Sequence, residues 1–421
     1  MSNALADRER LRRLFDLRSD VYISRGGAFD VDPYPTFHEL RESGPVHAHS
    51  PHEPLGWTGP VFFQGLPYPD RPHFTAYDFE TCSTILKDDE HFVTNVPPIG
   101  NEQVLPNTIL FMDGKEHRAH RTLVQPSFIP AKVAWWLDNW IRGSVEALID
   151  SIAPTGSADL NLDLCAPVPM LTITGSFGLT DDEALQIREA VTSDLGDTTT
   201  MARLLAPIIA ARRQEPQDDL ITVLTQAELT DDDGAVHRLN DIEILTFAFV
   251  LLAAGTGTTW KQMGITLWAL LTHPETMEQV RQDPSLMRGV IEESVRWMLT
   301  DPAFSRFAVK DTTLAGVHIP AGAVVHACLG AANRDPKRWD RPDEFDPFRP
   351  MKPHLGFGFG PHTCLGMHVA RMEMTHAINT ALAKLPNLRL DPNAPAPQVI
   401  GLYERGMDTV PVVFDAAGSA S

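Results

Sequence analysis

The stretch Phe357-Gly358-Phe359-Gly360-Pro361-His362-Thr363-Cys364-Leu365-Gly366 places one cysteine between a glycine-rich loop and a predicted helix. The helix is predicted from apolar residues at helical spacing, namely Leu365, Val369, Met372, Ile378, Leu382 and Leu385. A cysteine at a helix N-terminus faces unpaired backbone N–H groups and the positive end of the helix dipole, which favour a thiolate. Because glycines carry no side chain, a flat, bulky group can lie against this loop. The residues alone therefore predict a shielded thiolate under a planar ligand.

This stretch also resembles the haem-binding loop of the cytochrome P450 family, in which a cysteine thiolate is the axial iron ligand. The simpler interpretation is an ordinary buried cysteine in a loop, which leaves the other fixed positions of the pattern unexplained. The resemblance implies the P450 fold: mainly α with a small β region (α+β), a triangular helical prism. In that fold, haem b (iron protoporphyrin IX) lies between a long central helix and the helix that follows the cysteine loop. Cys364 would bind the metal, and the other cofactor-binding positions of the loop would be Phe357, Gly358, His362 and Gly366.

The composition is that of a globular chain, with 43% hydrophobic and 21% charged residues among 421. Because no linker, repeat or low-complexity block divides the chain, we expect a single P450 domain over residues 1–421. The longest apolar run, Phe247–Ala254, is far shorter than the roughly 20 residues that span a bilayer. The segment from Met1 to Phe15 is rich in Arg, Asp and Glu, which is unlike a signal peptide or an anchor. We therefore expect no membrane association.

The four cysteines lie far apart without metal-ligand spacing, which indicates a reducing compartment and favours a cytoplasmic bacterial protein. The formal charge of −20 disfavours nucleic acid as a partner. A ferredoxin-type electron donor is itself acidic, so its docking on the proximal face would require a local basic patch. The resemblance offers these residues for the patch, although each also fits a scattered surface charge: Arg118, Arg121, Arg338, Arg341, Lys352 and Arg371. No pattern indicates oligomerisation, and we expect a monomer.

The strongest apolar helix is predicted to begin near Asn240, an N-cap with Glu243 three residues on, and to reach Leu271. Apolar residues cover nearly its whole circumference, so it should cross the core. The stretch Ala254-Gly255-Thr256-Gly257-Thr258-Thr259 interrupts it. Two glycines inside a helix cost about 1 kcal/mol each relative to alanine. Threonine hydroxyls there can bond a carbonyl one turn back and loosen the helix.

This interruption resembles the oxygen-binding groove of the P450 family. The resemblance implies that Ala254 and Gly255 lie against the cofactor and that Thr258 organises oxygen and its protons. The family usually has Asp or Glu directly before this threonine, where this chain has Gly257. Without that carboxylate, protons would travel through water admitted by the glycine or through a polar group of the substrate. Poor coupling of reductant use to product is the third possibility.

Two further sets of residues extend the resemblance. Glu293 and Arg296 are three residues apart and can pair on one helix face, which by itself describes a common solvated ion pair. The resemblance implies instead that this pair is buried and completed by Arg349, a network suited to core assembly rather than catalysis. Buried haem propionates need cationic or hydrogen-bonding partners. The positions that match those partners are His117, Arg121, Arg306 and His362.

The segments that the family directs over the substrate side of the haem are mostly apolar. The residues that we expect to line the pocket are Val96, Val250, Ala253, Phe304 and Leu402. No arginine or lysine stands among them, which favours a neutral, mainly hydrophobic small molecule. The stretch Glu183–Arg213, where the family keeps two helices that cover the site, looks short.

The leading interpretation is a haem-thiolate monooxygenase that inserts one atom of O2 into such a molecule. Electrons would come from NAD(P)H through ferredoxin reductase and ferredoxin. The nearest alternative is a peroxygenase that uses hydrogen peroxide directly, which Gly257 favours and Thr258 disfavours. A haem-thiolate sensor without catalysis is the third alternative, although a sensor has no need of the threonine groove.

Overall fold

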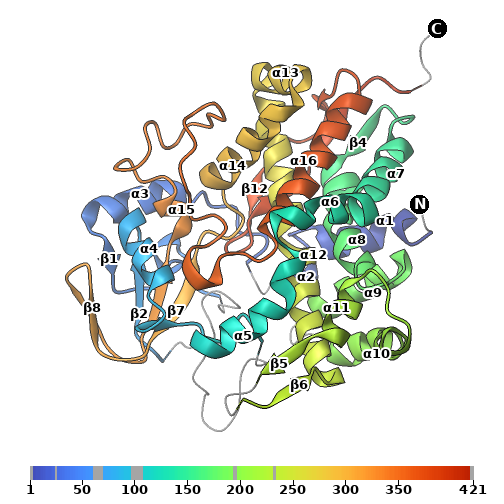
Figure 1. Cartoon of the computed structure of the whole chain (residues 1–421). Coiled ribbons are helices and arrows are strands. Elements are labelled where there is room, and N and C mark those ends of the chain that lie inside the picture. Colours follow the sequence, from blue (N-terminus) through green and yellow to red (C-terminus); the bar gives the residue numbers. More distant parts are fainter. Residues whose placement is uncertain are drawn as a thin grey trace.

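The computed structural model describes residues 3–23, 26–59, 70–95, 108–192, 197–230 and 234–417. Helices make up most of the molecule, and the larger sheet lies to one side of them (Figure 1). The helices are α1 (Arg8–Phe15), α2 (Asp20–Ile23), α3 (Tyr34–Ser43), α4 (Phe79–Lys87), α5 (Gly114–Val124), α6 (Val133–Trp136), α7 (Arg142–Ile152), α8 (Pro167–Gly175), α9 (Asp181–Thr192), α10 (Thr198–Gln214), α11 (Leu220–Gln226), α12 (Asp241–Thr272), α13 (Pro274–Gln282), α14 (Met287–Trp297), α15 (Leu329–Ala332) and α16 (Met367–Lys384).

The strands are short and form a minor part of the fold. They are β1 (Val46–His47), β2 (His73–Ala76), β3 (Phe92–Val93), β4 (Ser157–Asp159), β5 (Glu228–Thr230), β6 (Val236–Arg238), β7 (Phe304–Ala308), β8 (Thr312–Leu314), β9 (Val317–Ile319), β10 (Val324–Ala327), β11 (Arg389–Leu390), β12 (Val399–Ile400), β13 (Gly406–Met407) and β14 (Pro411–Val413). Among the described residues, the largest sheet has five strands in the order β1-β2-β10-β7-β3. β10 pairs with β2 in parallel and with β7 antiparallel, with Val325 opposite Arg306. The predicted class, mainly α with a small β region, is confirmed.

Helix α12 is the axis of the molecule. Its N-terminus has the predicted capping box, in which the Asn240 side chain accepts from the backbone of Glu243 and the Glu243 side chain accepts from that of Asn240. The helix packs against α8, α9, α10, α14 and α16 (Figure 1). By length and composition alone, α12 also has the character of a membrane-spanning helix, with a mean hydropathy of 1.6. The surrounding helices explain its apolar surface, because a helix that is buried in a core is apolar on all sides.

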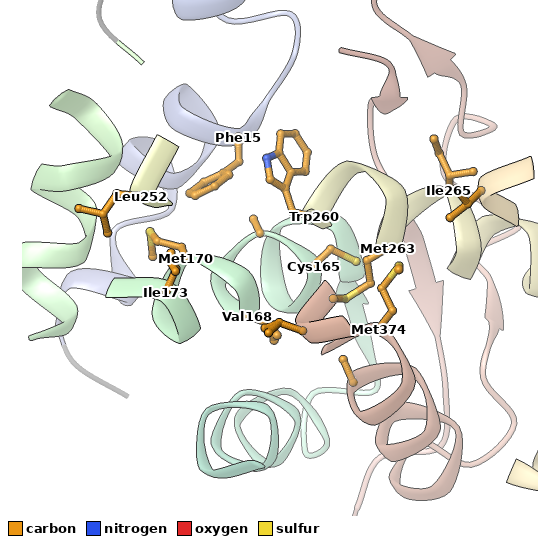
Figure 2. Close-up of a cluster of buried hydrophobic side chains, with 14 of the residues drawn as sticks. Phe15, Cys165, Val168, Met170, Ile173, Leu252, Trp260, Met263, Ile265 and Met374 are labelled. Carbon is orange, nitrogen blue, oxygen red and sulfur yellow. The ribbon is translucent and has the colours of Figure 1, made fainter. Parts of the chain in front are cut away.

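The core joins α12 to the N-terminal helix and to α16. The rings of Phe15 and Trp260 meet edge to face with centroids 5.6 Å apart (Figure 2). Below them in Figure 2, Met263 of α12 lies beside Cys165 and Met374. Flexible methionines fill irregular gaps between helices that cross at different angles. The packing fixes α12 along most of its length, and Ala254 is an exposed position within this buried region.

Candidate active site

The cysteine loop has a backbone that glycine alone accommodates. Gly358 and Gly360 have φ values of +72° and +78°, in the left-handed region that disfavours a side chain. A Cβ on Gly360 would also stand 2.6 Å from the carbonyl oxygen of Leu86 at the end of α4. The N–H of Cys364 donates to the carbonyl of Phe357 at 2.7 Å, which closes the loop. The glycines therefore serve the loop conformation itself.

The structure corrects the predicted start of the following helix. Leu365 was expected to begin it, but α16 begins at Met367 with Gly366 as its N-cap. Cys364 therefore precedes the N-cap by two residues. The sulfur of Cys364 accepts a hydrogen bond from the N–H of Gly366. One directed hydrogen bond thus replaces the predicted contact with the first turn of the helix.

Cys364 differs from the other cysteines in its surroundings. Its side chain is exposed, whereas Cys82, Cys165 and Cys328 are buried. Enough protein nevertheless surrounds it that desolvation raises the pKa of its thiol, although the Gly366 N–H and the charge of Arg121 act in the opposite direction. In the cofactor-free protein, burial therefore opposes the thiolate, while the Gly366 N–H favours it as predicted. Coordination to a metal deprotonates a thiol outright, so the thiolate depends on the ligand.

The predicted groove in α12 is a strip of the helix that no side chain covers. Leu252 and Trp260 are fully buried, yet Ala254 is exposed and Gly255 and Thr258 are half-exposed. This part of α12 is therefore less covered by the described residues than the positions on either side of it. The two glycines differ in purpose. A Cβ on Gly255 would stand 2.8 Å from Ile173, so Gly255 permits close packing with α8.

At Gly257, by contrast, a Cβ would meet no atom of another described segment within 4 Å. Its carbonyl oxygen accepts a hydrogen bond from Lys261 Nζ at 2.8 Å. Position 257 therefore has room for a side chain, and the groove is wider there than the local packing requires.

Thr258 has a free hydroxyl, unlike most threonines of its helix. The hydroxyls of Thr246, Thr256 and Thr266 each donate to a carbonyl one turn back. Within the part of the chain that the structure describes, the Thr258 hydroxyl has no such partner. The expected carbonyl bond within the interrupted stretch is made by Thr256, at 2.8 Å from Leu252. The Thr258 hydroxyl can therefore both donate a hydrogen bond to a ligand beside α12 and accept one from it.

The residues predicted to hold an anionic cofactor group lie near one another. The rings of His117 and His362 stack with centroids 4.0 Å apart. Arg121 donates to the carbonyl of Thr363 at 2.6 Å, beside Cys364. Arg306 lies on β7, and its charge helps to lower the pKa of His362. Residues from α5, from β7 and from the cysteine loop itself therefore lie near one another.

These groups lack sufficient negative charge around them. Burial lowers the pKa of Arg306 to about 10, and among the described residues no carboxylate lies within ion-pair distance of its guanidinium. Burial also lowers the pKa of His117 to about 4, and its Nδ1 has no hydrogen-bond partner. Buried polar groups without partners are rare in proteins unless a ligand completes them. The arrangement fits a planar cofactor with two carboxylates.

Asp113 is a member of this group that the sequence did not single out. Its carboxylate accepts the backbone N–H groups of Thr94 and Asn95 and lies 3.6 Å from His362 Nε2. Burial raises the pKa of Asp113, but the hydrogen bonds from His362, Thr94 and Asn95 outweigh burial and lower it overall. Its position at the N-cap of α5 was visible in the sequence, whereas its contact with His362 joins distant segments.

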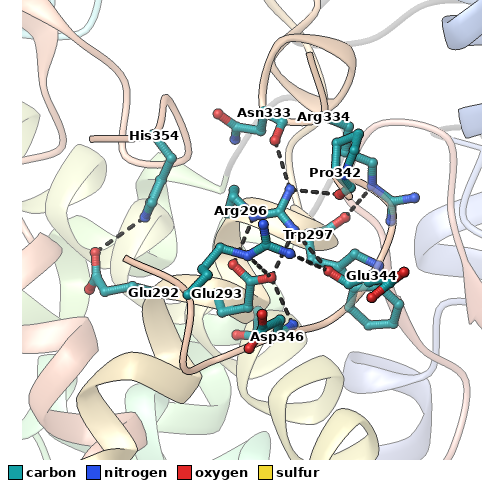
Figure 3. A network of polar contacts seen from close by, with 12 residues as sticks. Glu292, Glu293, Arg296, Trp297, Asn333, Arg334, Pro342, Glu344, Asp346 and His354 are labelled. Atoms are coloured by element: carbon teal, nitrogen blue, oxygen red, sulfur yellow. Dashed lines mark hydrogen bonds and ion pairs between the residues drawn. The ribbon is translucent and has the colours of Figure 1, made fainter. Parts of the chain in front are cut away.

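An ion network holds the chain that leads to the cysteine loop (Figure 3). Arg296 binds Glu293 through two nitrogens, each at 2.8 Å, and Arg349 donates to Glu293 at 2.9 Å. Arg296 also donates to the carbonyls of Asn333, Pro342 and Glu344. All three ionic side chains are buried, at 10% exposure or less. The network anchors α14 to the loops before Cys364. Its role is structural, and it takes no part in the groove of α12.

The predicted pocket residues differ in exposure. Ala253 and Phe304 are half-buried and retain open surface. Val250 and Leu402 are 4% exposed, and Leu402 packs against Gly26. Val96 lies outside the described residues. The stretch that looked short, Glu183–Arg213, contains most of α9 and α10, helices of 12 and 17 residues.

Comparison with known proteins places this site in a family. The family model for cytochrome P450 matches residues 195–392. PikC, a cytochrome P450 monooxygenase from Streptomyces venezuelae, is 31% identical, with 87% of each chain covered. The 6-deoxyerythronolide B hydroxylase of Saccharopolyspora erythraea is 30% identical, covering 95% of this chain and 98% of the hydroxylase.

The fold agrees with solved structures of the family. P450BioI, solved in complex with an acyl carrier protein that carries hexadec-9Z-enoic acid, matches with a TM-score of 0.78 and 27% identity. That match covers 91% of this chain and 98% of P450BioI. Members of the family use a haem-thiolate cofactor. This chain belongs to the cytochrome P450 family and is a cytochrome P450 monooxygenase.

Proposed function

We propose that this protein inserts one atom of O2 into a neutral, mainly hydrophobic small organic molecule, with haem b as its cofactor. Electrons come from NAD(P)H through ferredoxin reductase and a ferredoxin. The protein acts as a monomer in the cytoplasm, and residues 1–421 form one P450 domain. The observation that carries the proposal is the exposed sulfur of Cys364 at the end of the glycine-rich loop, close enough to Arg121 for the guanidinium charge to act on it.

The residues have distinct parts in this function. Cys364 would bind the haem iron, and the propionates would meet His117, Arg121, Arg306 and His362. When bound, the haem supplies the chemistry of O2 activation and C–H oxidation. The chain itself orients the guest, excludes water and moves protons. The free hydroxyl of Thr258 is suited to hold oxygen-derived groups and pass protons to them.

The charge around the pocket supports a neutral substrate. Asp301 precedes Phe304 by three residues, and burial together with the charge of Glu404 raises the pKa of Asp301 to about 7. A substrate carboxylate in this region would add negative charge where charge is already disfavoured. Two relatives are hydroxylases by name, one of 6-deoxyerythronolide B and one of mycinamicin IV. A neutral macrolactone is therefore a reasoned first probe.

The proposed docking patch for the ferredoxin is smaller than the sequence indicated. Arg341 pairs with Glu344 at 2.6 Å, and Arg371 pairs with Glu292 at 2.6 Å. Their charges are largely offset by these carboxylates. Four cations of the set remain, of which Arg121 donates to the carbonyl of Thr363 beside the cysteine. The other three are Arg118, Arg338 and Lys352. These cations are on an acidic protein, and salt screens exposed charges. The affinity for the ferredoxin should therefore fall as salt is added.

The test begins with the haem protein and two probes. The ferrous CO complex should give the red-shifted Soret band of a thiolate ligand. 6-Deoxyerythronolide B should shift the Soret band of the ferric protein at lower concentration than hexadec-9Z-enoic acid. A stronger response to the acid would contradict the neutral class. A CO complex without the red-shifted band would remove Cys364 from the metal.

Gly257 favours a second candidate, the peroxide-driven peroxygenase. Turnover of 6-deoxyerythronolide B with hydrogen peroxide alone is compared with turnover with ferredoxin, reductase and NADPH. Higher product yield from the reductase system supports the monooxygenase. Product from peroxide alone, with none from the reductase system, would establish the second candidate instead.

A further inference from the structure

A buried lysine lies directly beneath the open position in the groove. Lys261 is 0% exposed and follows Gly257 by one helical turn. Its Nζ donates to the carbonyl of Gly257 at 2.8 Å and pairs with Glu404 at 2.6 Å. Helical side chains point back toward the N-terminus of their helix, so Lys261 reaches toward the groove. Burying an ammonium costs several kcal/mol unless partners compensate, so this placement calls for a reason.

Two carboxyl groups from distant segments accompany the lysine. Glu404 lies in the turn between β12 and β13, and Asp301 lies between α14 and β7. Burial and the charge of Glu404 raise the pKa of Asp301, whereas the charge of Lys261 lowers it. Burial and a nearby negative charge both oppose ionisation, so Asp301 holds its proton more tightly than an isolated carboxyl group does. The cluster is therefore a store of exchangeable protons.

The two ends of the cluster differ in their access to water: Lys261 is shielded from water, whereas Glu404 reaches it. Lys261 Nζ lies 4.8 Å from the ring centroid of Trp260 and 5.4 Å from that of Tyr22, and these rings exclude water from the ammonium. The Glu404 side chain is 30% exposed and so reaches water. The path from Glu404 through Lys261 ends at Gly257, where the groove has open space.

Two other charged groups face this region. Arg188 of α9 donates to the hydroxyls of Tyr22 and Thr256, and Arg405 donates to the carbonyl of Gly401. Both are buried and bound to neutral oxygens. Among the described residues, neither forms a hydrogen bond with the Lys261 ammonium or an ion pair with Asp301. The titratable partners of Lys261 within the cluster are therefore Glu404 and Asp301.

We propose that Lys261, Glu404 and Asp301 form an acid cluster that supplies protons to the groove beside Thr258. This inference rests on the proposed function and answers how a chain with glycine at position 257 delivers protons. Lys261 gives one proton from Nζ to a base in the groove and becomes a neutral amine. The carboxyl of Glu404, protonated by Asp301 or by water, returns a proton to Nζ, and bulk water restores the carboxyl groups. Lys261 is thus a positioning and proton-relay residue.

The first test removes the charge of Lys261 and keeps its length. With ferredoxin, reductase, NADPH and 6-deoxyerythronolide B, Lys261→Met should lower the product formed per NADPH by about tenfold or more, with hydrogen peroxide released instead. Lys261→Arg, which keeps the charge, should lose less. Lys384→Met is the matched control, because Lys384 also pairs with a carboxylate at 2.6 Å, but at the surface. It should leave the yield unchanged.

Turnover with hydrogen peroxide separates proton supply from folding. Hydrogen peroxide brings its own two protons, so peroxide-driven product formation by Lys261→Met should stay within about twofold of the unmodified protein. Equal losses in both assays, or no loss in either, would overturn the proposal. Adding Gly257→Glu to Lys261→Met should restore the product yield, because the position has room for a side chain.

An infrared titration tests the cluster without any turnover. The unmodified haem protein should show a carboxylic-acid C=O band near neutral pH that disappears in Asp301→Asn and persists in the Lys384→Met control. Without that band the acid cluster would not exist, whatever the enzyme oxidises. With the band present and no product from any electron source, the proposed function would fail while the cluster stands.

Discussion

The two sides of the proposed haem site are built on opposite principles. On the side of Cys364, Glu293 is bound by both Arg296 and Arg349, and the loop carbonyls of Phe357 and Gly360 accept backbone N–H groups. On the side of the groove, the Thr258 hydroxyl has no hydrogen-bond partner among the described residues, and Gly257 faces open space. A ligand atom must be held in one place, which a closed loop and a buried ion network can do. A reacting site must leave hydrogen-bonding capacity unused until the guest arrives.

The sharpest way to break this comparison is at the sulfur. Cys364→Ser replaces the proposed ligand with a hydroxyl, which is a much weaker donor of electron density to iron. We expect reductase-driven product to fall below detection and the red-shifted CO band to disappear. The variant should keep the thermal stability of its apoprotein, since Cys364 is accessible rather than packed. Retained product in Cys364→Ser would separate the loop from catalysis.

The second prediction concerns the buried ion network on the side of Cys364. Arg296→Met leaves the buried Glu293 with one partner fewer, and removal of one member of a buried ion pair costs about 3–5 kcal/mol. Urea unfolding measures the free energy of unfolding. Arg341→Met is the control, because Arg341 pairs with Glu344 at the surface and should cost less than about 1 kcal/mol. Similar costs for both variants would show that the network is not rigid.

The third prediction sharpens the open side. Gly257→Glu places a carboxylate where the helix leaves room, so the fold should accept it with little loss of stability. The ratio of product to NADPH should change, because the new acid competes with the proton path that ends at this position. Identical ratios in the variant and the unmodified protein would exclude an acid at position 257 from the reaction.

The smallest expected effect is a pH dependence at the propionate anchors. Burial holds the pKa of His117 at about 4, below the ordinary value of 6.5, so the unfolded chain binds a proton more readily than the folded one. The apoprotein should therefore lose stability as pH falls from about 6.5 toward 4. Thermal melts of His117→Gln should show a shallower decline over that range. An equal slope in both proteins would contradict the neutral, buried histidine.

The sequence was informative wherever a local pattern carried the structure. The capping box at Asn240 and Glu243 was predicted to the residue, because both partners lie within one turn. The start of α16 was predicted two residues early, since apolar spacing does not reveal that Gly366 is the N-cap. The burial that opposes a thiolate at Cys364 was not visible in the sequence. The helix dipole is visible in a sequence, whereas the desolvation that outweighs it comes from the packed fold.

The features that escaped prediction depend on contacts between distant segments. Lys261 reads as one polar residue in an apolar helix, and nothing near it in sequence announces Glu404 or Asp301. Asp113 likewise reads as an ordinary N-cap. Val250 and Leu402 were assigned to a pocket from their segments, but their side chains are covered in the structure. Spacing along the chain identifies the elements of the site, and only packing decides which side chains remain open.

The close approach of Gly360 to Leu86 has a mechanical consequence. A methyl group at Gly360 would stand 2.6 Å from the last carbonyls of α4, so the two backbones are in direct contact. Lys87, the final residue of α4, also lies over the ring of Phe359 at 4.6 Å. The end of α4 and the cysteine loop are therefore packed together without an intervening side chain. The position of α4 thus bears directly on the loop that carries Cys364.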